Sequence, residues 1–279
     1  MTEKLESIGE REFVLFRDLI YKESGITLNE SKKALLEARL SKRMRGTGIS
    51  SYKEYYDLVK KDKTGNELTL LLDVVSTNLT FFYREIKHFD FMNNVLIPEL
   101  AARHQNNPAA QIRVWCAAAS SGEEPYSILF TLLEHKLFQT SWNLKMLASD
   151  VSVDMLKIAS EGKYARKRVD KVPQAILNKY FNKTGTGADS VFTVQADFRK
   201  MIQFKRFNLM TPEFPFKHQF DFIFCRNVMI YFDSPTREKL VGKFYKYLRS
   251  GGYLIVGHSE SLTGLRHEYK YTIPTVYQK

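Results

Sequence analysis

The chain has 279 residues, of which 44% are hydrophobic and 13% aromatic, so it can bury a large core and is not a disordered protein. It carries 42 Lys and Arg against 31 Asp and Glu, and this net charge of +11 indicates an acidic partner. No apolar run is long enough to span a bilayer, and the N-terminal segment lacks the apolar core of a signal peptide. Cys116 and Cys225 form neither a disulfide framework nor a zinc knuckle. We therefore expect a cytoplasmic protein with two reduced cysteines and no membrane insertion.

Residues 1–76 are predicted to form an all-helical domain. Apolar residues recur at helical spacing over residues 13–20, and Gly25 marks the end of that helix. A further helix is predicted from Lys32 to Met44, with Asn29 as its N-cap. Four basic side chains fall within about 100° of one another on this helix: Lys32, Arg39, Lys42 and Arg43. They form either a solvated face or a docking surface for an acidic helix or for phosphates.

Residues 77–110 are predicted to be a linker and connecting helix, and strands then alternate with helices over residues 111–279. This alternation predicts a mostly parallel, doubly wound sheet. The predicted strands cover 112–116, 144–149, 202–207, 220–225 and 253–257. The predicted helices cover 125–135, 154–161 and 236–248, with Ser152 capping the second and Gly251–Gly252 ending the third.

Residues 163–200 interrupt this alternation. The segment Val191–Val194 and the Gly-rich turn at 184–187 predict a small inserted antiparallel β-subdomain. It coincides with the most basic part of the chain, because residues 160–206 hold 11 basic and 4 acidic side chains.

A loop of small residues, 117–125, follows the first predicted strand and would let a ligand lie against the backbone. The second strand ends in Asp150, a place where an acid commonly binds the ribose of a nucleoside cofactor. The loop has only one glycine, Gly122, and carries Glu123 and Glu124 where a pyrophosphate would otherwise sit. Carboxylates repel phosphate and suit the ammonium and sulfonium groups of S-adenosylmethionine. The pattern thus favours a methyl donor over NAD, although one glutamate could simply favour the start of the following helix.

Other catalytic motifs are absent from the sequence: there is no Walker A loop, no H-E-x-x-H and no G-x-S-x-G. The six histidines are scattered, and His88, His104 and His258 are each expected to have a structural or surface role. No metal site is predicted.

Four segments together resemble the CheR-type chemotaxis receptor methyltransferases, which are protein-glutamate O-methyltransferases. They are Thr-Asn-Leu-Thr-Phe-Phe-Tyr-Arg-Glu at 77–85, Ala-Ala-Ala-Ser-Ser-Gly-Glu-Glu-Pro-Tyr-Ser at 117–127, Phe-Ile-Phe-Cys-Arg-Asn-Val-Met-Ile-Tyr-Phe-Asp at 222–233, and Gly-His-Ser-Glu-Ser at 257–261. The string at 225–233 is highly specific, and the resemblance runs from about residue 10 to the end. One departure is Tyr83, where the family pattern has Phe.

The resemblance implies a helical N-terminal domain packed over a Rossmann-like class I methyltransferase domain with an inserted β-subdomain. It implies that Glu124 receives the methionyl ammonium of S-adenosylmethionine and that Asp150 binds the ribose. The other residues implied to bind the donor are Asn78, Thr80 and Arg84 on the linker, Ala118 in the first loop, Asn208 and Leu209 beside the adenine, and Arg226 and Asn227, which close the site.

The implied reaction is methyl transfer to receptor glutamates, which are already ionised at pH 7 and need no general base. Arg84 and Tyr231 are the predicted catalytic residues: Arg84 would orient the substrate carboxylate and Tyr231 would donate a hydrogen bond to it. The alternatives are a structural salt bridge of Arg84 with Glu85 or a neighbouring helix, and a packed core position for Tyr231.

The implied partners are chemoreceptors, whose acidic helical methylation region would dock on the basic helix. In part of the family the β-subdomain also captures a C-terminal receptor peptide by strand addition, and the turn at 185–187 resembles that tethering type. We expect a monomer that binds no nucleic acid.

Two alternatives are a nucleic-acid methyltransferase, which the net charge would suit, and a non-catalytic receptor-binding adaptor. The place of an Asn/Asp-Pro-Pro-Tyr/Phe box holds Arg-Asn-Val-Met at 226–229, which argues against the first. The presence of Glu124, Asp150 and Asn227 together argues against the second.

Overall fold

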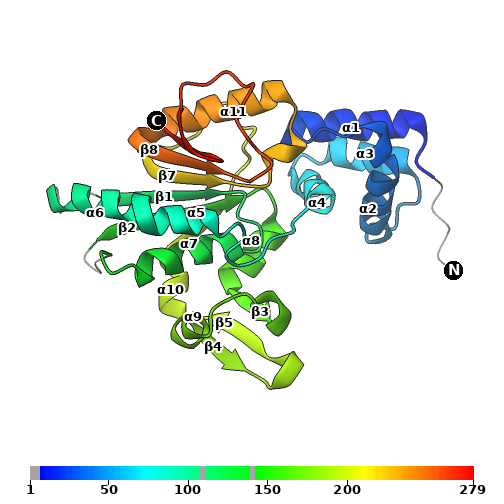
Figure 1. Ribbon diagram of the computed structural model, residues 1–279. Coiled ribbons are helices and arrows are strands. Elements are labelled where there is room, and N and C mark those ends of the chain that lie inside the picture. The colour runs from blue at the N-terminus through cyan, green and yellow to red at the C-terminus, as the bar shows by residue number, and fades with distance from the viewer. Residues whose placement is uncertain (1–6, 107–110, 139–141) are drawn as a thin grey trace.

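The computed structural model describes residues 7–106, 111–138 and 142–279 (Figure 1). Residues 1–6 of the predicted helical domain and residues 107–110 of the predicted linker segment lie outside this range. In the view of Figure 1, the N-terminal helices lie to one side of a large sheet, and a smaller sheet lies below it.

The N-terminal part is helical. Its elements are α1 (Glu10–Ser24), the 3-10 turn η1 (Glu30–Lys32), α2 (Lys33–Arg45), α3 (Tyr52–Lys61) and α4 (Asn66–Val75). Helix α1 ends as predicted at Gly25, whose φ of 73° is left-handed and suits glycine. Asn29 occupies an N-cap position, but that of the 3-10 turn η1 rather than of α2, and its side chain makes no capping hydrogen bond. The Asn29 side chain accepts the Ser31 hydroxyl, at 2.6 Å, and the chain makes a 3-10 turn before α2 begins.

Glu67 of α4 holds three helices of this part together. Its carboxylate accepts two hydrogen bonds from the Arg43 guanidinium of α2, at 2.8 and 2.6 Å, and one from the Tyr55 hydroxyl of α3, at 2.9 Å. The bidentate geometry is the strong form of a charge-assisted pair. The hydrogen bonds from Arg43, and then from Tyr55, hold the pKa of the Glu67 carboxyl below its ordinary value.

We expect Glu67→Gln to lower the free energy of unfolding by about 1–3 kcal/mol at pH 7. Because the folded-state pKa of Glu67 lies below the unfolded one, this stabilisation is complete above the unfolded pKa and is lost as the pH falls through the folded pKa. Urea unfolding of both proteins at neutral and acid pH should therefore show a difference that shrinks on acidification. An undiminished difference at acid pH would contradict this. Asp57→Asn, which removes an exposed pair with Lys53, is the control and should change little.

Residues 76–86 form an irregular linker that leads into a long helical stretch. This stretch is α5 (Lys87–Phe91), a single π-helical segment η2 (Met92–Leu96) and α6 (Ile97–Asn106). Within the described residues, no helix has the combined length and apolar character needed to cross a membrane.

The large sheet has seven strands in the order β6-β2-β1-β7-β8-β10-β9. These are β1 (Gln111–Ala117), β2 (Asn143–Asp150), β6 (Ile202–Arg206), β7 (Phe220–Cys225), β8 (Leu248–Val256), β9 (Lys270–Ile273) and β10 (Val276–Gln278). The first five pair in parallel, and β10 pairs antiparallel with both β8 and β9. The predicted fold class is confirmed, but the C-terminal hairpin of β9 and β10 was not predicted.

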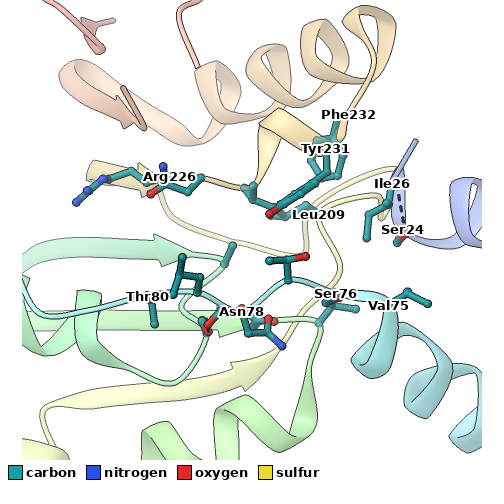
Figure 2. Close-up of a pocket in the computed structure, with 18 of the residues that line it drawn as sticks. Ser24, Ile26, Val75, Ser76, Asn78, Thr80, Leu209, Arg226, Tyr231 and Phe232 are labelled. Carbon is teal, nitrogen blue, oxygen red and sulfur yellow. Dashed lines mark hydrogen bonds between the residues drawn. The ribbon is translucent and has the colours of Figure 1, made fainter. Parts of the chain in front are cut away.

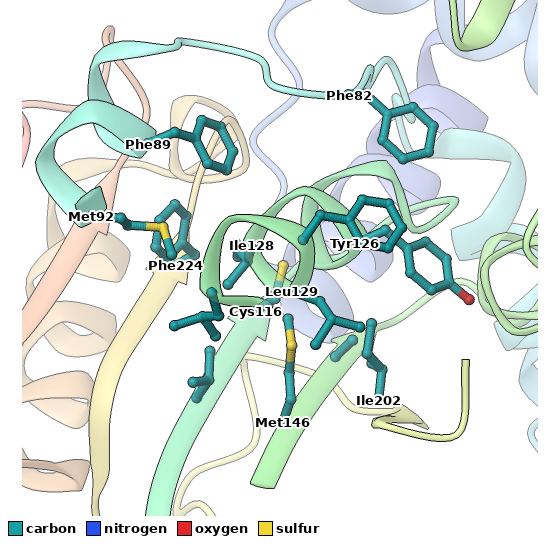
Figure 3. Packing of buried hydrophobic residues seen from close by; sticks show 14 of the residues in the cluster. Phe82, Phe89, Met92, Cys116, Tyr126, Ile128, Leu129, Met146, Ile202 and Phe224 are labelled. Carbon is teal, nitrogen blue, oxygen red and sulfur yellow. The ribbon is translucent and has the colours of Figure 1, made fainter. Parts of the chain in front are cut away.

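Helices cover both faces of this sheet, because alternate residues of a buried strand point to opposite sides. From β1, Val114 and Cys116 enter one core with α5, α6 and α7 (Glu123–Glu134), part of which Figure 3 shows. Trp115 and Ala117 enter the other core, beneath α11 (Ser234–Tyr247). Helix α8 (Val153–Glu161) follows β2 and is capped by the Ser152 hydroxyl as predicted. The predicted glycine stop of α11 is wrong, since the pair at 251–252 lies inside β8.

The insertion contains a separate three-stranded antiparallel sheet in the order β3-β5-β4. Its strands are β3 (Lys163–Ala165), β4 (Phe181–Thr184) and β5 (Val191–Val194). Around them lie the 3-10 turns η3 (Arg166–Arg168) and η4 (Gly187–Asp189), and the helices α9 (Gln174–Tyr180) and α10 (Ala196–Arg199). Because β3 and β4 each pair on one side only, both are edge strands.

Candidate functional site

A cavity of about 350 Å³ lies beyond the carboxyl ends of β1, β2, β6 and β7 (Figure 2). The strand order reverses between β1 and β7, and ligands of open α/β sheets bind at such a point. The linker and the segment between α1 and α2 also line it, through Ser76–Thr80 and Ile26–Leu28, and so do side chains of α2 such as Leu35 and Arg39. The cavity is thus closed over by the N-terminal part of the chain.

The structure brings every predicted donor-binding and catalytic residue to this one cavity. Those lining it are Asn78, Thr80, Arg84, Ala118, Glu124, Asp150, Asn208, Leu209, Arg226, Asn227 and Tyr231. They come from the linker and from the segments that follow four strands. Their meeting at one cavity is therefore not a result of nearness in sequence. Their individual roles stay predictions.

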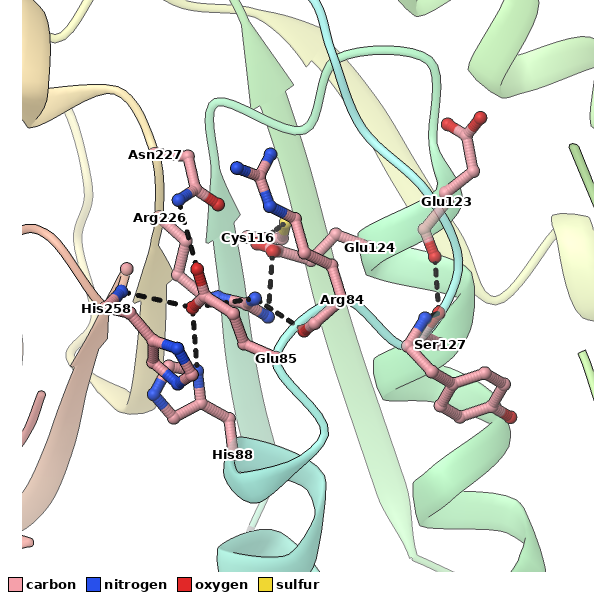
Figure 4. Close-up of polar contacts among 12 residues, drawn as sticks. Arg84, Glu85, His88, Cys116, Glu123, Glu124, Ser127, Arg226, Asn227 and His258 are labelled. Atoms are coloured by element: carbon pink, nitrogen blue, oxygen red, sulfur yellow. Dashed lines mark hydrogen bonds and ion pairs between the residues drawn. The ribbon is translucent and has the colours of Figure 1, made fainter. Parts of the chain in front are cut away.

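Glu124, in the first turn of α7, is buried and does not stand alone. One carboxylate oxygen accepts the Cys116 thiol at 3.3 Å, and the other lies 3.2 Å from the Arg226 guanidinium (Figure 4). Burial raises the pKa of the Glu124 carboxyl, and Arg226 offsets part of that rise. Since Arg226 is shared with Glu85, at 3.1 Å, one cation serves two carboxylates and leaves a net negative charge beside the cavity.

The interpretation of Glu123 and Glu124 as a carboxylate pair facing one ligand is wrong. Glu123 is fully buried, and its carboxylate forms an ion pair with Arg168 of the insertion and accepts the Ser121 hydroxyl at 2.8 Å. Arg168 also donates to the Ser121 hydroxyl oxygen, at 2.6 Å, and Tyr164 donates to the Ser121 carbonyl, at 2.8 Å. Glu123 therefore joins the insertion to the loop after β1.

Asp150 ends β2 and is buried, with a relative exposure of 7%. Its carboxylate accepts the backbone N–H of Ser120, at 2.7 Å, and of Ser152, at 2.9 Å. Burial raises the pKa of this carboxyl, while these backbone donors oppose the rise. Two oxygens offer about four acceptor sites, so Asp150 can hold the first loop and still accept hydrogen bonds from a ligand.

The backbone around the cavity is strained. Of the six non-glycine residues with positive φ in the described ranges, five lie in the linker or the strand-end loops: Tyr83, Glu85, Ala118, Ser120 and Asn227. Such conformations cost free energy and cluster at functional sites, where the surrounding structure holds them. Sequence patterns gave no sign of them, because none of these residues is a glycine.

Glu260, which the sequence analysis did not single out, holds the loop after β7. It is buried, and its carboxylate accepts the backbone N–H groups of Asn227, Gly257 and Ile230 at 2.6, 2.6 and 3.2 Å. A Cβ at Gly257 would lie 2.6 Å from the Asn227 side-chain nitrogen, so a larger residue would displace this loop. Glu260 thereby fixes Asn227 and the turn that carries Tyr231.

Arg84 does not form the salt bridge considered above, whereas the Tyr231 ring packs in part against the core beneath α11. Arg84 donates to the Leu79 carbonyl, at 2.8 Å, and has no ion-pair partner in the described part of the chain. Glu85 pairs with Arg226 instead. Tyr231 is half-buried, and Figure 2 shows its ring at the cavity. Among the described residues, its hydroxyl has no hydrogen-bond partner.

Asn208 and Leu209 follow β6. The Asn208 side chain donates to the Glu23 carbonyl, at 2.6 Å, and accepts the Met210 N–H, at 2.9 Å, so it joins this loop to α1. Lys243 of α11 donates to the Leu209 carbonyl, at 2.6 Å. Sequence analysis missed Lys243, because nothing in a helical lysine shows that it reaches a loop more than 30 residues away.

The four basic residues of the predicted docking surface occupy different environments. Lys32 and Lys42 are exposed, Lys32 also lines the cavity, and neither side chain has an ion-pair partner among the residues described. Arg39 lines the cavity, donating to the Val75 carbonyl and, at 2.8 Å, to the Thr77 hydroxyl oxygen. Arg43 is bound to Glu67. The four therefore do not form one free basic face.

Comparison with known proteins gives matches over nearly the whole chain. The family model described as the CheR methyltransferase SAM-binding domain matches residues 78–277, and the CheR methyltransferase all-alpha domain matches residues 11–76. The chain is 42% identical over 264 residues to the chemotaxis protein methyltransferase of Borreliella burgdorferi, covering 94% of this chain and 91% of that protein. It is 37% identical to a probable chemotaxis protein methyltransferase of Rhizobium etli, covering 88% and 91%. It is 36% identical to chemotaxis protein methyltransferase 2 of Pseudomonas aeruginosa, covering 95% and 92%.

Proposed function

The chain belongs to the CheR methyltransferase family, and from this premise we propose that it transfers methyl groups from S-adenosylmethionine to glutamate side chains of chemotaxis receptors. The observation that carries the proposal is the meeting of Glu124, Asp150, Arg84 and Tyr231 at one cavity, at the switch point of a SAM-binding domain. Neither the nucleic-acid methyltransferase nor the adaptor is favoured by these matches.

The chemistry of the lining suits the donor. When bound, S-adenosylmethionine supplies a methyl group on a positively charged sulfur. Glu124 offers a carboxylate to the amino-acid ammonium, and the net negative charge of the group it forms with Glu85 and Arg226 favours a cation nearby. Asp150 would accept the ribose hydroxyls. Leu209 offers an apolar contact for the adenine. Asn78 and Thr80 would hold the linker over the donor, and Ala118 and Asn227 would form the walls.

The glutamate that accepts the methyl group is already ionised at neutral pH, so the enzyme need not remove a proton from it. The site must instead hold the carboxylate in position and exclude water from it. Among the described residues, no histidine lines the cavity. Arg84, without a carboxylate partner of its own, is placed to hold the substrate carboxylate through its planar guanidinium. Tyr231 would donate one hydrogen bond and fix the direction of the attacking oxygen.

We expect Tyr231→Phe to lower kcat about tenfold, because it removes one hydrogen bond to a charged substrate. The affinity for S-adenosylhomocysteine should change by no more than about twofold, since that bond is made to the acceptor. Methylation kinetics and calorimetry measure the two quantities. Tyr271→Phe, which alters an exposed tyrosine of β9, is the control. An unchanged kcat in Tyr231→Phe would show that the hydroxyl has no part in the reaction.

Receptor docking follows from the basic helix. The acidic methylation region would lie along Lys32 and Lys42 of the α2 region, while Arg39 and Arg43 hold this helix to α4. A second contact is proposed at the β-subdomain, where a receptor C-terminal peptide would add a strand to the β4 edge. The basic side chains of this part of the chain suit an acidic peptide.

The direct test uses the full chain with methyl-labelled S-adenosylmethionine and the cytoplasmic fragment of a chemoreceptor. The expected result is label on the fragment that mild base releases as methanol, as from a methyl ester, and that disappears when the acceptor glutamates are changed to glutamine. Label on RNA would support the nucleic-acid enzyme. Binding to the receptor with no transfer would support the adaptor.

A further inference from the structure

We propose that Glu85, His88 and His258 form a binding site for a divalent transition-metal cation such as Zn²⁺, beside the donor cavity. Glu85 ends the linker, His88 lies in α5 and His258 follows β8. One ligand atom from each lies within 4.8 Å of those of the other two, and Figure 4 shows the three side chains gathered around the Glu85 carboxylate. Two imidazole nitrogens and one carboxylate are a recurrent set of protein ligands for such ions.

Among the described residues, Nε2 of His88 has a hydrogen-bond partner and Nδ1 has none. When the Thr275 hydroxyl donates to the Pro274 carbonyl, at 2.6 Å, its oxygen accepts the Nε2–H of His88, at 2.8 Å, and Nδ1 carries the lone pair of the ring. An N–H bond of this kind on the far nitrogen is what usually orients a metal-binding histidine.

The free Nδ1 of His88 faces another acceptor. It is buried, has no hydrogen-bond partner among the described residues, and lies 3.5 Å from a Glu85 carboxylate oxygen. Two lone-pair atoms at this distance gain nothing from each other. Ligand atoms about 2.0–2.1 Å from a tetrahedral ion would be separated by roughly 3.4 Å, so a cation fits between them with little movement. The Glu85 carboxylate already accepts hydrogen bonds from Asn227 and His258, whereas a buried nitrogen without a partner, such as Nδ1, calls for a ligand or a proton.

His258 supplies the third ligand, and its exposed ring lets a metal ion reach the site from solvent. Its ring is exposed and lies edge-on to that of His88, with 5.2 Å between the centroids. Its backbone N–H donates to Glu85, at 3.2 Å, which holds the carboxylate toward both rings. A fourth position would remain open to solvent, as in sites that take a water.

The local charge permits a cation despite the neighbouring guanidinium. Arg226 is the one cation in contact with Glu85 in the described structure, and it is shared with Glu124, so these three groups sum to one negative charge. An ion at Glu85 would draw that carboxylate away from Arg226 and leave Arg226 more fully on Glu124. We therefore expect an occupied site to weaken donor binding, and the donor to weaken metal binding by the same factor.

The test uses the full chain without an affinity tag, titrated with Zn²⁺ by calorimetry and with Co²⁺ by visible absorption, so that neither readout depends on activity. One equivalent is expected to bind. His258→Ala and Glu85→Gln should each weaken binding at least tenfold. His218→Ala, which removes another exposed histidine, is the matched control and should bind like wild type.

Two results would overturn the site: no binding by the wild-type chain, or equal binding by wild type and His258→Ala. Because the His258 side chain is exposed, His258→Ala is expected to fold like wild type, and circular dichroism of each variant checks this. The coupling is tested separately, by the affinity for S-adenosylhomocysteine with and without saturating Zn²⁺. An unchanged affinity would overturn the coupling.

Discussion

Replacing Arg226 with methionine is expected to lower the free energy of unfolding by about 3–5 kcal/mol. The Arg226 side chain has no exposed surface, and its guanidinium lies 3.1 Å from Glu85 and 3.2 Å from Glu124. It also donates to the Arg84 carbonyl, at 2.5 Å, and so binds the linker to β7. Methionine fills a similar volume but leaves two largely buried carboxylates, with side chains 12% and 10% exposed, without their cation. Denaturant unfolding measures the loss.

The origin of this loss can be separated from simple packing. If the unpaired carboxylates cause it, Arg226→Met combined with Glu85→Gln and Glu124→Gln should recover much of the stability, because the buried charges are gone. Arg166→Met, which removes an exposed pair with Asp170, is the control and should cost less than about 1 kcal/mol. A triple variant no more stable than Arg226→Met alone would place the effect in packing or in the Arg84 contact.

The fold was largely predictable because its strands are short apolar runs bounded by turn signals. The strand predicted over 220–225 matches β7, and the strand over 112–116 differs from β1 by one residue at each end. The errors have local causes. Gly251 and Gly252 resemble a helix stop, but β8 begins before them, and pairing with β7 carries it through them with a shift in register. The β9–β10 hairpin was missed although residues 268–273 alternate between polar and apolar side chains, because its strands are only four and three residues long.

The site was predictable where a motif named a residue, and not where the chemistry depends on a partner far along the chain. The resemblance pointed to Glu124 and Arg226 separately, but only the structure pairs them and adds Glu85 as a third member. Glu123 looked equivalent to Glu124 because they are neighbours. One helical step turns it by about 100°, however, toward Arg168 of the insertion. The spacing of residues along a helix predicts the direction in which a side chain points, but not which residue it contacts.

Replacing Asp150 with alanine is expected to weaken binding of S-adenosylhomocysteine about 100-fold, or ~2.7 kcal/mol. This assumes two hydrogen bonds between the ribose hydroxyls and a charged, buried acceptor, each worth about 1.5–3 kcal/mol, less what water regains in the vacated space. The variant also frees the N–H groups of Ser120 and Ser152, which Asp150 holds at 2.7 and 2.9 Å. Calorimetry with the wild-type chain and the variant measures the change in affinity.

Because Asp150 both holds the first loop and faces the cavity, a second substitution must separate the two roles. Asp150→Asn keeps one oxygen that can accept a hydrogen bond from Ser120 or Ser152, but it removes the charge and one acceptor. The affinity for S-adenosylhomocysteine should therefore fall by an intermediate factor. The melting temperature should change less than in Asp150→Ala. Asp154→Ala, which alters an exposed acid in the first turn of α8, controls for the general loss of negative charge. If both Asp150 variants bound the ligand like wild type, the ribose would not be held at the end of β2. If both lost affinity only in proportion to lost stability, Asp150 would act through the loop alone, and Glu124 would be left as the main charged contact for the donor.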